Sequence, residues 1–120
     1  MKLNKLTPVL YTNELQQTVD FYVNILGFAC LTNNTSFGWA AVALDEVEIM
    51  ICLPNEHIPF EKPVFTGSFY INTNDVDSMW EKLKHTAKIC YDLENFEYGM
   101  REFAVYDNNG YLIQFGQQVS

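Results

Sequence analysis

The tetrapeptide Thr12-Asn13-Glu14-Leu15 recurs as Thr73-Asn74-Asp75-Val76, a shift of 61 residues (73 − 12) in a chain of 120. Each copy follows a run typical of a β-strand and opens a stretch with apolar residues at helical spacing. The matching apolar positions are Leu15, Val19 and Tyr22 in one copy and Val76, Trp80 and Leu83 in the other. The repeat therefore predicts two copies of one strand–cap–helix unit.

The composition indicates one compact domain, residues 1–120, rather than two independent ones. The chain is 48% hydrophobic and 15% aromatic, which is enough to build a sizeable core. Its 15 acidic and 7 basic residues give a net charge of −8. Phosphate contacts need clustered Lys and Arg, so this balance argues against nucleic-acid binding. It would attract a cationic ligand, although acidity that serves only solubility explains it equally simply.

Three scattered cysteines, Cys30, Cys52 and Cys90, lack any CxxC spacing. We therefore expect buried, reduced thiols rather than a disulfide framework or a thiolate metal site. No stretch approaches the roughly 18 apolar residues of a membrane span. The sequence is thus expected to belong to a soluble, cytoplasmic protein that does not bind membranes.

The order of strand and helix signals divides the chain into two βαβββ units. The first unit, 1–53, has a helix that Gly27 should end. Residues 54–65, rich in Pro and polar residues, are the expected linker. The second unit, 66–120, closes with two strands around Asp107-Asn108-Asn109-Gly110, whose Asn-Gly is a strong hairpin signal. We therefore expect an α+β fold with a helix on one face of each curved sheet.

Strand alternation gives each sheet one apolar and one mixed face. The apolar face, expected beneath the helices, comprises Pro8, Leu10, Ile49, Ile51, Leu53, Phe69, Ile71, Ile113 and Phe115. The mixed face comprises Thr7, Glu48, Met50, Cys52, Ser68, Tyr70, Asn72, Leu112 and Gln114. Mostly apolar surfaces with a few placed polar groups are typical of binding pockets. An ordinary solvent-exposed sheet face is the alternative.

Several motifs resemble the vicinal oxygen chelate superfamily, which includes glyoxalase I, extradiol dioxygenases, fosfomycin resistance enzymes and bleomycin resistance proteins. They are Thr7-Pro8-Val9-Leu10, Phe21-Tyr22, Leu26-Gly27-Phe28 and the closing run from Tyr98 to Tyr111. The family's usual Asp-Pro-x-Gly turn lacks its proline here. The resemblance implies two βαβββ repeats that form a curved mixed sheet around a cleft, commonly in a homodimer.

The family's metalloenzymes carry His or Glu ligands at four strand positions, which match Thr7, Met50, Ser68 and Gln114 here. Thr7 and Ser68 are related by the same shift of 61 (68 − 7), which supports the register of the match. None of the four is His, Asp or Glu. Divalent metals in such sites need imidazole or carboxylate donors, so we expect no metal and no other cofactor.

The other candidate catalytic groups are few. His57 falls in the linker and His85 near the end of the second helix, so neither occupies the mixed face, and we expect both to be non-catalytic. Glu48 does face inward by parity. It is either a lone general base or, more simply, a carboxylate at the sheet edge in contact with solvent.

Without metal ligands, the closest resemblance is to the bleomycin resistance proteins, which sequester a drug unchanged. It implies a homodimer with an exchanged N-terminal strand, Pro8 at its hinge, and an acidic aromatic cleft that suits a planar cation. Trp39 matches an aromatic cleft position, although core packing explains it equally well. The expected ligand-binding residues are Phe37, Trp39, Glu48, Met50, Phe60, Ser68, Tyr70, Tyr98 and Gln114.

The leading hypothesis is therefore a metal-independent protein that binds a small aromatic or cationic molecule, for example a bleomycin-type antibiotic. The alternative is a metal-dependent glyoxalase-type lyase or isomerase, which rests on the fold alone. A protein-interaction module has less support, because no apolar helical stripe is evident beyond the two amphipathic helices.

Overall fold

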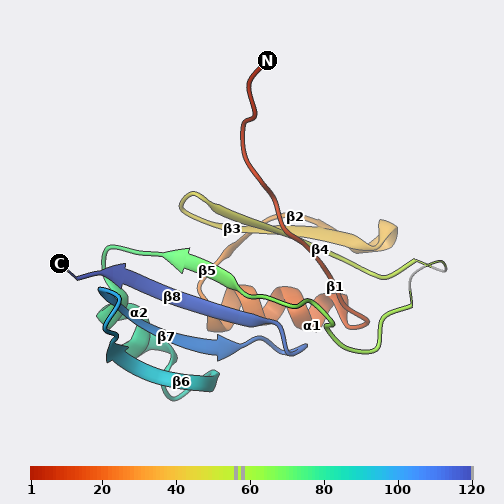
Figure 1. Cartoon of the computed structure of the whole chain (residues 1–120). Helices are drawn as coiled ribbons and strands as arrows, with labels where there is room; N and C mark the ends of the chain where they lie inside the picture. Colours follow the sequence, from red (N-terminus) through yellow and green to blue (C-terminus); the bar gives the residue numbers. More distant parts are fainter. Residues whose placement is uncertain (56, 58, 120) are drawn as a thin grey trace. The chain divides into compact units, whose positions relative to one another are not determined.

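The fold is described from a computed structural model of the chain, covering residues 1–55, 57 and 59–119 (Figure 1). The chain forms two compact units, Met1–Glu61 and Lys62–Ser120. The division falls inside the expected linker 54–65, of which positions 56 and 58 lie outside the described residues.

The first unit is a four-stranded mixed sheet with one helical segment. Its strand order is β1-β4-β3-β2, with β1 parallel to β4 and the other neighbours antiparallel. The strands are β1 (Val9–Tyr11), β2 (Ala29–Asn34), β3 (Trp39–Leu44) and β4 (Val47–Cys52), with α1 (Leu15–Asp20), a π-helical turn (Phe21–Ile25) and a 3₁₀ turn (Thr35–Phe37) between them.

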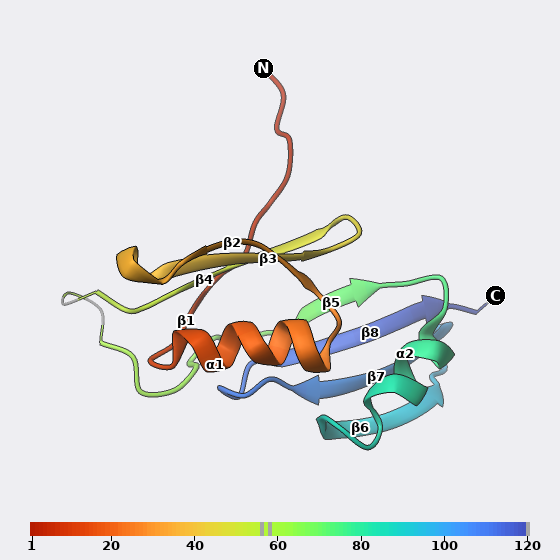
Figure 2. The same ribbon diagram turned by 180° about the vertical axis from the view of Figure 1, so that it is seen from behind.

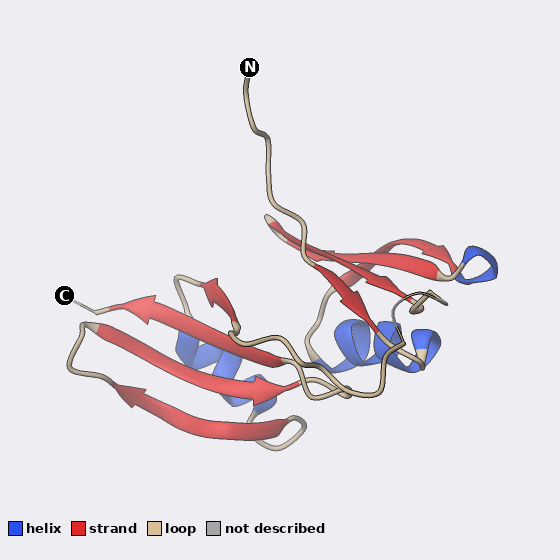
Figure 3. Cartoon of the chain, turned by 45° about the vertical axis from the view of Figure 1, so that its right-hand side comes forward, coloured by secondary structure: helices blue, strands red, loops and turns tan. Residues whose placement is uncertain are grey.

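The second unit repeats this topology in the order β5-β8-β7-β6, with β5 parallel to β8. Its elements are β5 (Phe69–Asn72), α2 (Val76–Leu83), β6 (Lys88–Asn95), β7 (Met100–Tyr106) and β8 (Leu112–Gln118). Figure 3 shows α2 against one face of these four strands. The predicted α+β fold with two βαβββ units is thereby confirmed.

The repeated tetrapeptide has the same local structure in both units. The Thr12 hydroxyl oxygen accepts a hydrogen bond from the Glu14 amide at 2.9 Å, and Thr73 accepts the equivalent bond from Asp75 at 3.1 Å. Asp75 then caps α2, because its carboxylate accepts the Ser78 amide at 3.2 Å. The shared threonine thus fixes the turn from strand to helix in each copy.

The first helix begins at Leu15 and continues through the π-helical turn to Ile25, as Figure 2 shows from behind. The Leu26 amide donates to the carbonyl of Phe21 at 3.1 Å, five residues earlier. Gly27 has a φ of 85°, a conformation that glycine adopts without strain. The predicted stop at Gly27 is confirmed.

The helices cover the apolar faces of the sheets. In the first unit α1 packs on β3 and β4, over the buried Val42, Ile49 and Ile51. In the second, α2 packs on β7 and β8, over Phe103 and Phe115. One assignment is wrong: Leu53 is 42% exposed, because β4 ends at Cys52 and alternation does not extend beyond the strand.

The expectation for the cysteines is correct in one respect and wrong in the other. All three are free thiols, as predicted. Cys30 and Cys90 are exposed, however, because they lie on β2 and β6, at the outer edges of their sheets. Within the described chain, neither helix is long and apolar enough to cross a membrane.

The turn between β7 and β8 is organised by Asp107 rather than by proline. This residue is 6% exposed, and its Oδ1 accepts the amides of Asn109 at 2.8 Å and of Gly110 and Tyr111 at 2.9 Å each. Gly110 has a φ of 101°, which the Asn-Gly signal anticipates. The carboxylate therefore holds the hairpin in register.

We expect Asp107→Ala to lower the free energy of unfolding by about 2–4 kcal/mol, because three backbone donors lose a charged acceptor. Urea denaturation followed by circular dichroism measures the loss. Asp107→Asn keeps one oxygen acceptor and should lose roughly half as much. Equal losses for both variants would contradict this role of the carboxylate.

Candidate functional site

The face of the second sheet opposite α2 carries a polar cluster. Strand pairing places Tyr70 beside Gln114 between β5 and β8, and Gln114 beside Ala104 between β8 and β7. Ala104 in turn pairs with Tyr91 on β6. Paired residues point to the same side of a sheet, so this row crosses all four strands on one face.

The centre of the cluster is Glu102 on β7, which is 1% exposed. Its Oε1 accepts hydrogen bonds from the hydroxyls of Tyr98 at 2.7 Å and Tyr70 at 3.1 Å. Its Oε2 accepts from the hydroxyl of Tyr91 and from the Gln114 amide at 3.4 Å. Multiple donors of this kind compensate the cost of burying a carboxylate.

Gln114 extends this network towards β5. Its Nε2 also donates to the Tyr91 hydroxyl oxygen at 2.8 Å, and its Oε1 accepts from the Ser68 hydroxyl. Both ends of the amide are therefore engaged. All four strands of the second sheet and the loops before β5 and β7 contribute to one hydrogen-bonded unit. We call it the Glu102 cluster: Ser68, Tyr70, Tyr91, Tyr98, Glu102 and Gln114.

The cluster keeps its tyrosines protonated. The hydrogen bond to Glu102, followed by desolvation and the negative charge of that carboxylate, raises the pKa of Tyr98 to about 12. Burial first, and then Glu102, raises the pKa of Tyr70 to about 12. The same causes raise the pKa of Tyr91. At neutral pH each hydroxyl is thus a neutral donor to Glu102.

No counter-charge comes from the neighbouring Arg101, because successive strand residues point to opposite faces. Its guanidinium pairs instead with Asp77 of α2, at 2.8 Å. This hydrogen bond is the main cause of a lowered Asp77 pKa. Glu94, opposite Glu102 in the β6–β7 ladder, is exposed and adds negative charge near the cluster.

Aromatic rings border the cluster on the side of β6. The ring of Phe96 stacks on that of Tyr98, with centroids 5.5 Å apart and planes at 10°, and meets that of Tyr91 edge-on at 5.7 Å. Tyr98 is 62% exposed, so one end of this group contacts solvent. The surface thus combines polar groups with aromatic faces.

A glycine makes room for Tyr70. Gly116 pairs with Glu102 across the β7–β8 ladder, and a Cβ at this position would lie 1.9 Å from the Tyr70 hydroxyl oxygen. The tyrosine therefore passes directly over Gly116 to reach Glu102. Tyr70 can occupy this position only because residue 116 has no side chain.

We expect Gly116→Ala to displace the Tyr70 ring and break its hydrogen bond to Glu102, at a cost of about 1–2 kcal/mol. Thermal denaturation and the chemical shifts of Tyr70 measure both effects. In a Tyr70→Ala background nothing obstructs the new methyl group, so the same substitution should cost clearly less. An equal cost in both backgrounds would contradict the proposed steric cause.

The residues at the family's metal-ligand positions do not suit a metal ion. Gln114 and Ser68 are hydrogen-bonded to each other, and Met50 and Thr7 offer a thioether and a hydroxyl. Divalent transition metals prefer imidazole and carboxylate donors. Among the described residues, no group of three His, Cys, Asp or Glu side chains is arranged to hold a metal ion.

The first unit carries the remaining predicted site residues. Strand pairing places Trp39 opposite Cys52, on the face of β3 and β4 that also carries Met50 and, further along β4, Glu48. The carboxylate of Glu48 forms an ion pair with Lys5 at 2.7 Å. The Glu48 carboxylate, near the start of β4, is therefore paired with a lysine. Trp39 is only half-buried, so core packing does not fully account for it.

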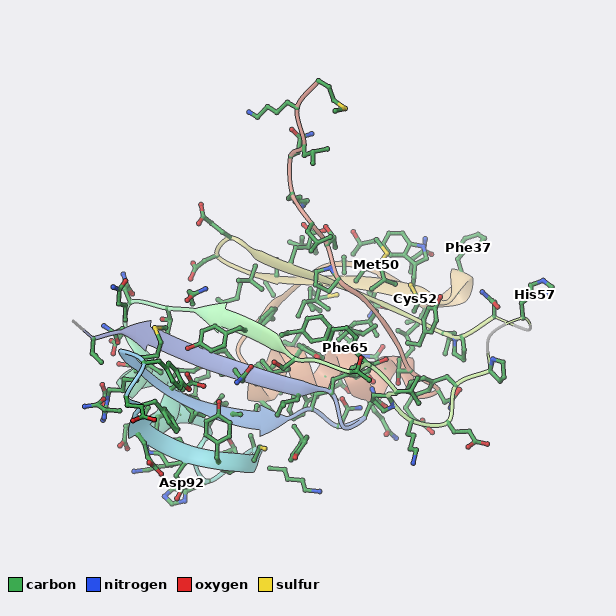
Figure 4. All side chains as sticks on the ribbon, in the orientation of Figure 1. Phe37, Met50, Cys52, His57, Phe65 and Asp92 are labelled. Atoms are coloured by element: carbon green, nitrogen blue, oxygen red, sulfur yellow. The ribbon has the colours of Figure 1, made fainter. Side chains whose placement is uncertain are left out.

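Two predicted aromatic residues lie outside this row. Phe37 is 79% exposed on the 3₁₀ turn before β3, whereas Met50 lies on β4 itself (Figure 4). Phe60 is half-buried near the end of the first unit, where its carbonyl accepts the Asn13 side-chain amide at 2.7 Å. His57 and His85 are both exposed.

The structure therefore brings four predicted residues together: Ser68, Tyr70, Tyr98 and Gln114. Sequence reasoning missed the group that joins them, Glu102, and its partner Tyr91. A signal for Glu102 existed: in β7 it alternates with the apolar Phe103 and Val105, which assigns it to the polar face.

Comparison with known proteins identifies a matching family model and solved structures that have a similar fold. Residues 2–115 match the model of the Glyoxalase/Bleomycin resistance protein/Dioxygenase superfamily. No curated protein matches the chain. TnmS3, an antibiotic binding protein from Streptomyces sp. CB03234, is similar in structure, with a TM-score of 0.79, 21% identity, and 98% of each chain covered.

Two further solved structures are similar. A glyoxalase/bleomycin resistance protein/dioxygenase from Alicyclobacillus acidocaldarius has a TM-score of 0.78 and 17% identity, covering 98% of this chain and 92% of its own. A lactoylglutathione lyase from Agrobacterium tumefaciens has a TM-score of 0.74 and 16% identity, covering 95% and 92%. At these identities the structures support the fold, and the family model supports the affiliation. The chain belongs to the Glyoxalase/Bleomycin resistance protein/Dioxygenase superfamily.

Proposed function

We propose that this chain is a metal-independent binding protein that sequesters a small aromatic or cationic molecule, with bleomycin-type antibiotics as candidate ligands. The Glu102 cluster forms the centre of the proposed binding surface. In the first unit, taken by itself, the residues proposed to bind a ligand are Phe37, Trp39, Glu48, Met50 and Phe60.

The observation that carries the proposal is a buried carboxylate on the sheet face that α2 leaves uncovered. Glu102 is 1% exposed, yet its partners Tyr70 and Tyr98 are 37% and 62% exposed. An internal stabilising network has little reason to end in solvent-exposed tyrosines. Such residues are common in binding sites, because they combine an apolar ring with a polar tip.

Charge and aromatic character support the same ligand class. The net charge of −8 favours the approach of cations, and aromatic faces attract them at short range. The superfamily contains binding proteins as well as enzymes, and TnmS3 is described as an antibiotic binding protein. This likeness supports a binding role for the chain.

The alternative is a metal-dependent glyoxalase-type lyase or isomerase, and a lactoylglutathione lyase from Agrobacterium tumefaciens is among the similar structures. That chemistry needs a metal, and the donors at the four expected positions suit one poorly. Elemental analysis after incubation with Zn²⁺, Ni²⁺ or Mn²⁺ distinguishes the metal-independent binding protein from the metal-dependent enzyme. A bound equivalent of metal together with turnover would favour the enzyme.

Two further features of the proposal concern assembly and location. We propose a homodimer with an exchanged N-terminal strand, because the apolar Leu3 and Leu6 before β1 are 85% and 90% exposed and a partner would cover them. In the single chain β1 pairs with β4, a pairing that the exchange would transfer to the partner. Light scattering on the purified protein measures the mass. We also place the protein in the cytoplasm, where its free thiols would stay reduced.

Titration calorimetry with metal-free bleomycin tests the drug-binding form of the proposal. We expect saturable binding that Tyr98→Ala weakens at least about tenfold, since aromatic residues dominate such contacts. Trp39→Ala tests the first-unit contribution in the same assay, and unchanged binding would remove Trp39 from the site. Absence of saturable heat at micromolar drug would contradict the drug-binding claim.

A further inference from the structure

The direction of each hydrogen bond in the Glu102 cluster is determined by its chemistry. A tyrosine hydroxyl has one proton and two lone pairs, and a carboxylate can only accept. Tyr70 and Tyr98 therefore give their single protons to Oε1 of Glu102, and Tyr91 gives its proton to Oε2. None of the three hydroxyls has a proton left for a ligand.

The amide of Gln114 is oriented by the same carboxylate. Its Nε2 faces Glu102 and the Tyr91 hydroxyl oxygen. The flipped orientation would bring the amide oxygen against Glu102, where two acceptors repel. The Gln114 oxygen must then face Ser68, whose only hydroxyl proton is committed to it.

The hydroxyl groups of the cluster consequently offer a ligand lone pairs alone. These lone pairs belong to the hydroxyl oxygens of Tyr70, Tyr98 and Ser68; Tyr70 and Tyr98 are exposed residues and Ser68 is half-buried. Tyr70 and Tyr98 bond the same carboxylate oxygen, so their hydroxyls lie within a few ångströms of each other. A single small group can contact both.

We propose that the Glu102 cluster selects organic cations that carry N–H bonds, namely protonated amines, amidines or guanidines attached to an aromatic body. The N–H groups donate to the hydroxyl oxygens of Tyr70 and Tyr98, and the charge is balanced by Glu102 behind them. The stacked rings of Phe96 and Tyr98 contact the aromatic body. This inference rests on the proposed binding function and specifies its ligand class.

The same arrangement rejects anions. A carboxylate or phosphate ligand would meet acceptor lone pairs, with Glu102 behind them and the exposed Glu94 beside them in the ladder. Neither Tyr70 nor Tyr98 can turn a proton towards an anion, because each already donates its only hydroxyl proton to Glu102. Selectivity therefore results from the hydrogen-bond directions as well as from charge.

Three probes of similar size separate these contributions: phenethylammonium, its N,N,N-trimethyl derivative and phenylacetate. Nuclear magnetic resonance titrations of the full chain, read at the side-chain amide of Gln114, give each affinity. We expect phenethylammonium to bind at least about tenfold more tightly than the trimethyl cation, since a hydrogen bond to a charged group is worth about that factor. Phenylacetate should bind more weakly than either cation.

Variants assign the preference to the cluster. Tyr70→Phe and Tyr98→Phe each remove a hydrogen-bond acceptor. Each variant should therefore bind phenethylammonium several-fold more weakly and bind the trimethyl cation with unchanged affinity. Glu102→Gln should reduce the preference for phenethylammonium over the trimethyl cation. Glu94→Gln removes an equal charge nearby and should leave this preference unchanged. If Glu102→Gln does not fold, the two Tyr→Phe variants test whether the preference comes from the cluster. Both substitutions are at exposed side chains.

The outcomes are distinguishable. Binding of both cations with equal affinity, or a preference that persists in both Tyr→Phe variants, would overturn the N–H inference and leave the binding function intact. If no probe shifts the resonances of the Glu102 cluster, the proposed binding function at this face fails as well.

Discussion

Replacing Glu102 with glutamine is expected to lower the pKa of Tyr98 from about 12 towards its ordinary value of 10.0. The hydrogen bond from Tyr98 to the carboxylate is the largest cause of the shift, and an amide neither carries the charge nor accepts as strongly. Tyrosinate absorbance in an alkaline titration measures the change. A Tyr98 pKa that stays near 12 would contradict the account.

Tyr70 provides an internal comparison in the same variant. Burial is the first cause of its raised pKa, with Glu102 second, so its pKa should fall less than that of Tyr98. Tyr70→Phe and Tyr98→Phe variants assign each titration step. Glu94→Gln is the matched control, because it removes an exposed carboxylate near the cluster and should leave both steps almost in place.

The shifts also have a consequence for stability. A tyrosine whose pKa is raised in the folded state stabilises the protein fully below the unfolded pKa of 10.0, and this contribution is lost as the pH rises to about 12. Urea denaturation between these pH values should show that the unfolding free energy falls more steeply with pH for the wild type than for Glu102→Gln. Parallel curves would indicate that the tyrosines are not coupled to Glu102.

The second large effect is expected at Phe103, whose replacement by alanine should cost about 3–5 kcal/mol of unfolding free energy. This ring is fully buried beneath α2. It stacks on Phe115 with centroids 5.4 Å apart and meets Trp80 at 5.2 Å. Its removal leaves a cavity between helix and sheet. Urea denaturation measures the loss.

Phe37→Ala is the chemically identical control at an exposed position. Phe37 is 79% exposed, so its truncation should change the unfolding free energy by less than about 0.5 kcal/mol. A loss at Phe37 comparable with that at Phe103 would contradict the burial that the structure assigns to both. The same variant reports whether Phe37 contributes to ligand binding, independently of folding.

Much of the fold can be predicted from the sequence, because helix starts and tight turns depend on hydrogen bonds between residues that are close in the chain. The shift of 61 located both helix starts, where Thr12 and Thr73 make equivalent hydrogen bonds. The Asn-Gly turn also fixes the register of β7 and β8, which pairs Tyr106 with Leu112 and hence Glu102 with Gly116. Glu102 was therefore within reach of sequence reasoning, although its significance was missed.

Other features depend on contacts that periodicity does not encode. Two irregularities interrupt the pairing of β6 with β7, one on each side of Tyr91, so alternation alone cannot place that ring beside Glu102. The position of Tyr70 depends on the absent side chain of Gly116, on a different strand. The exposure of Phe37 likewise depends on the 3₁₀ turn that precedes β3, which strand alternation does not predict.

The central claim is that the Glu102 cluster is a ligand-binding surface. Isotope-filtered nuclear Overhauser spectra of the full chain with phenethylammonium test it most directly, because they report which protein protons touch the bound probe. The account predicts contacts from the probe to the rings of Tyr70 and Tyr98. Contacts confined to the α2 side of the sheet, or none at a probe concentration that saturates the titration, would contradict it.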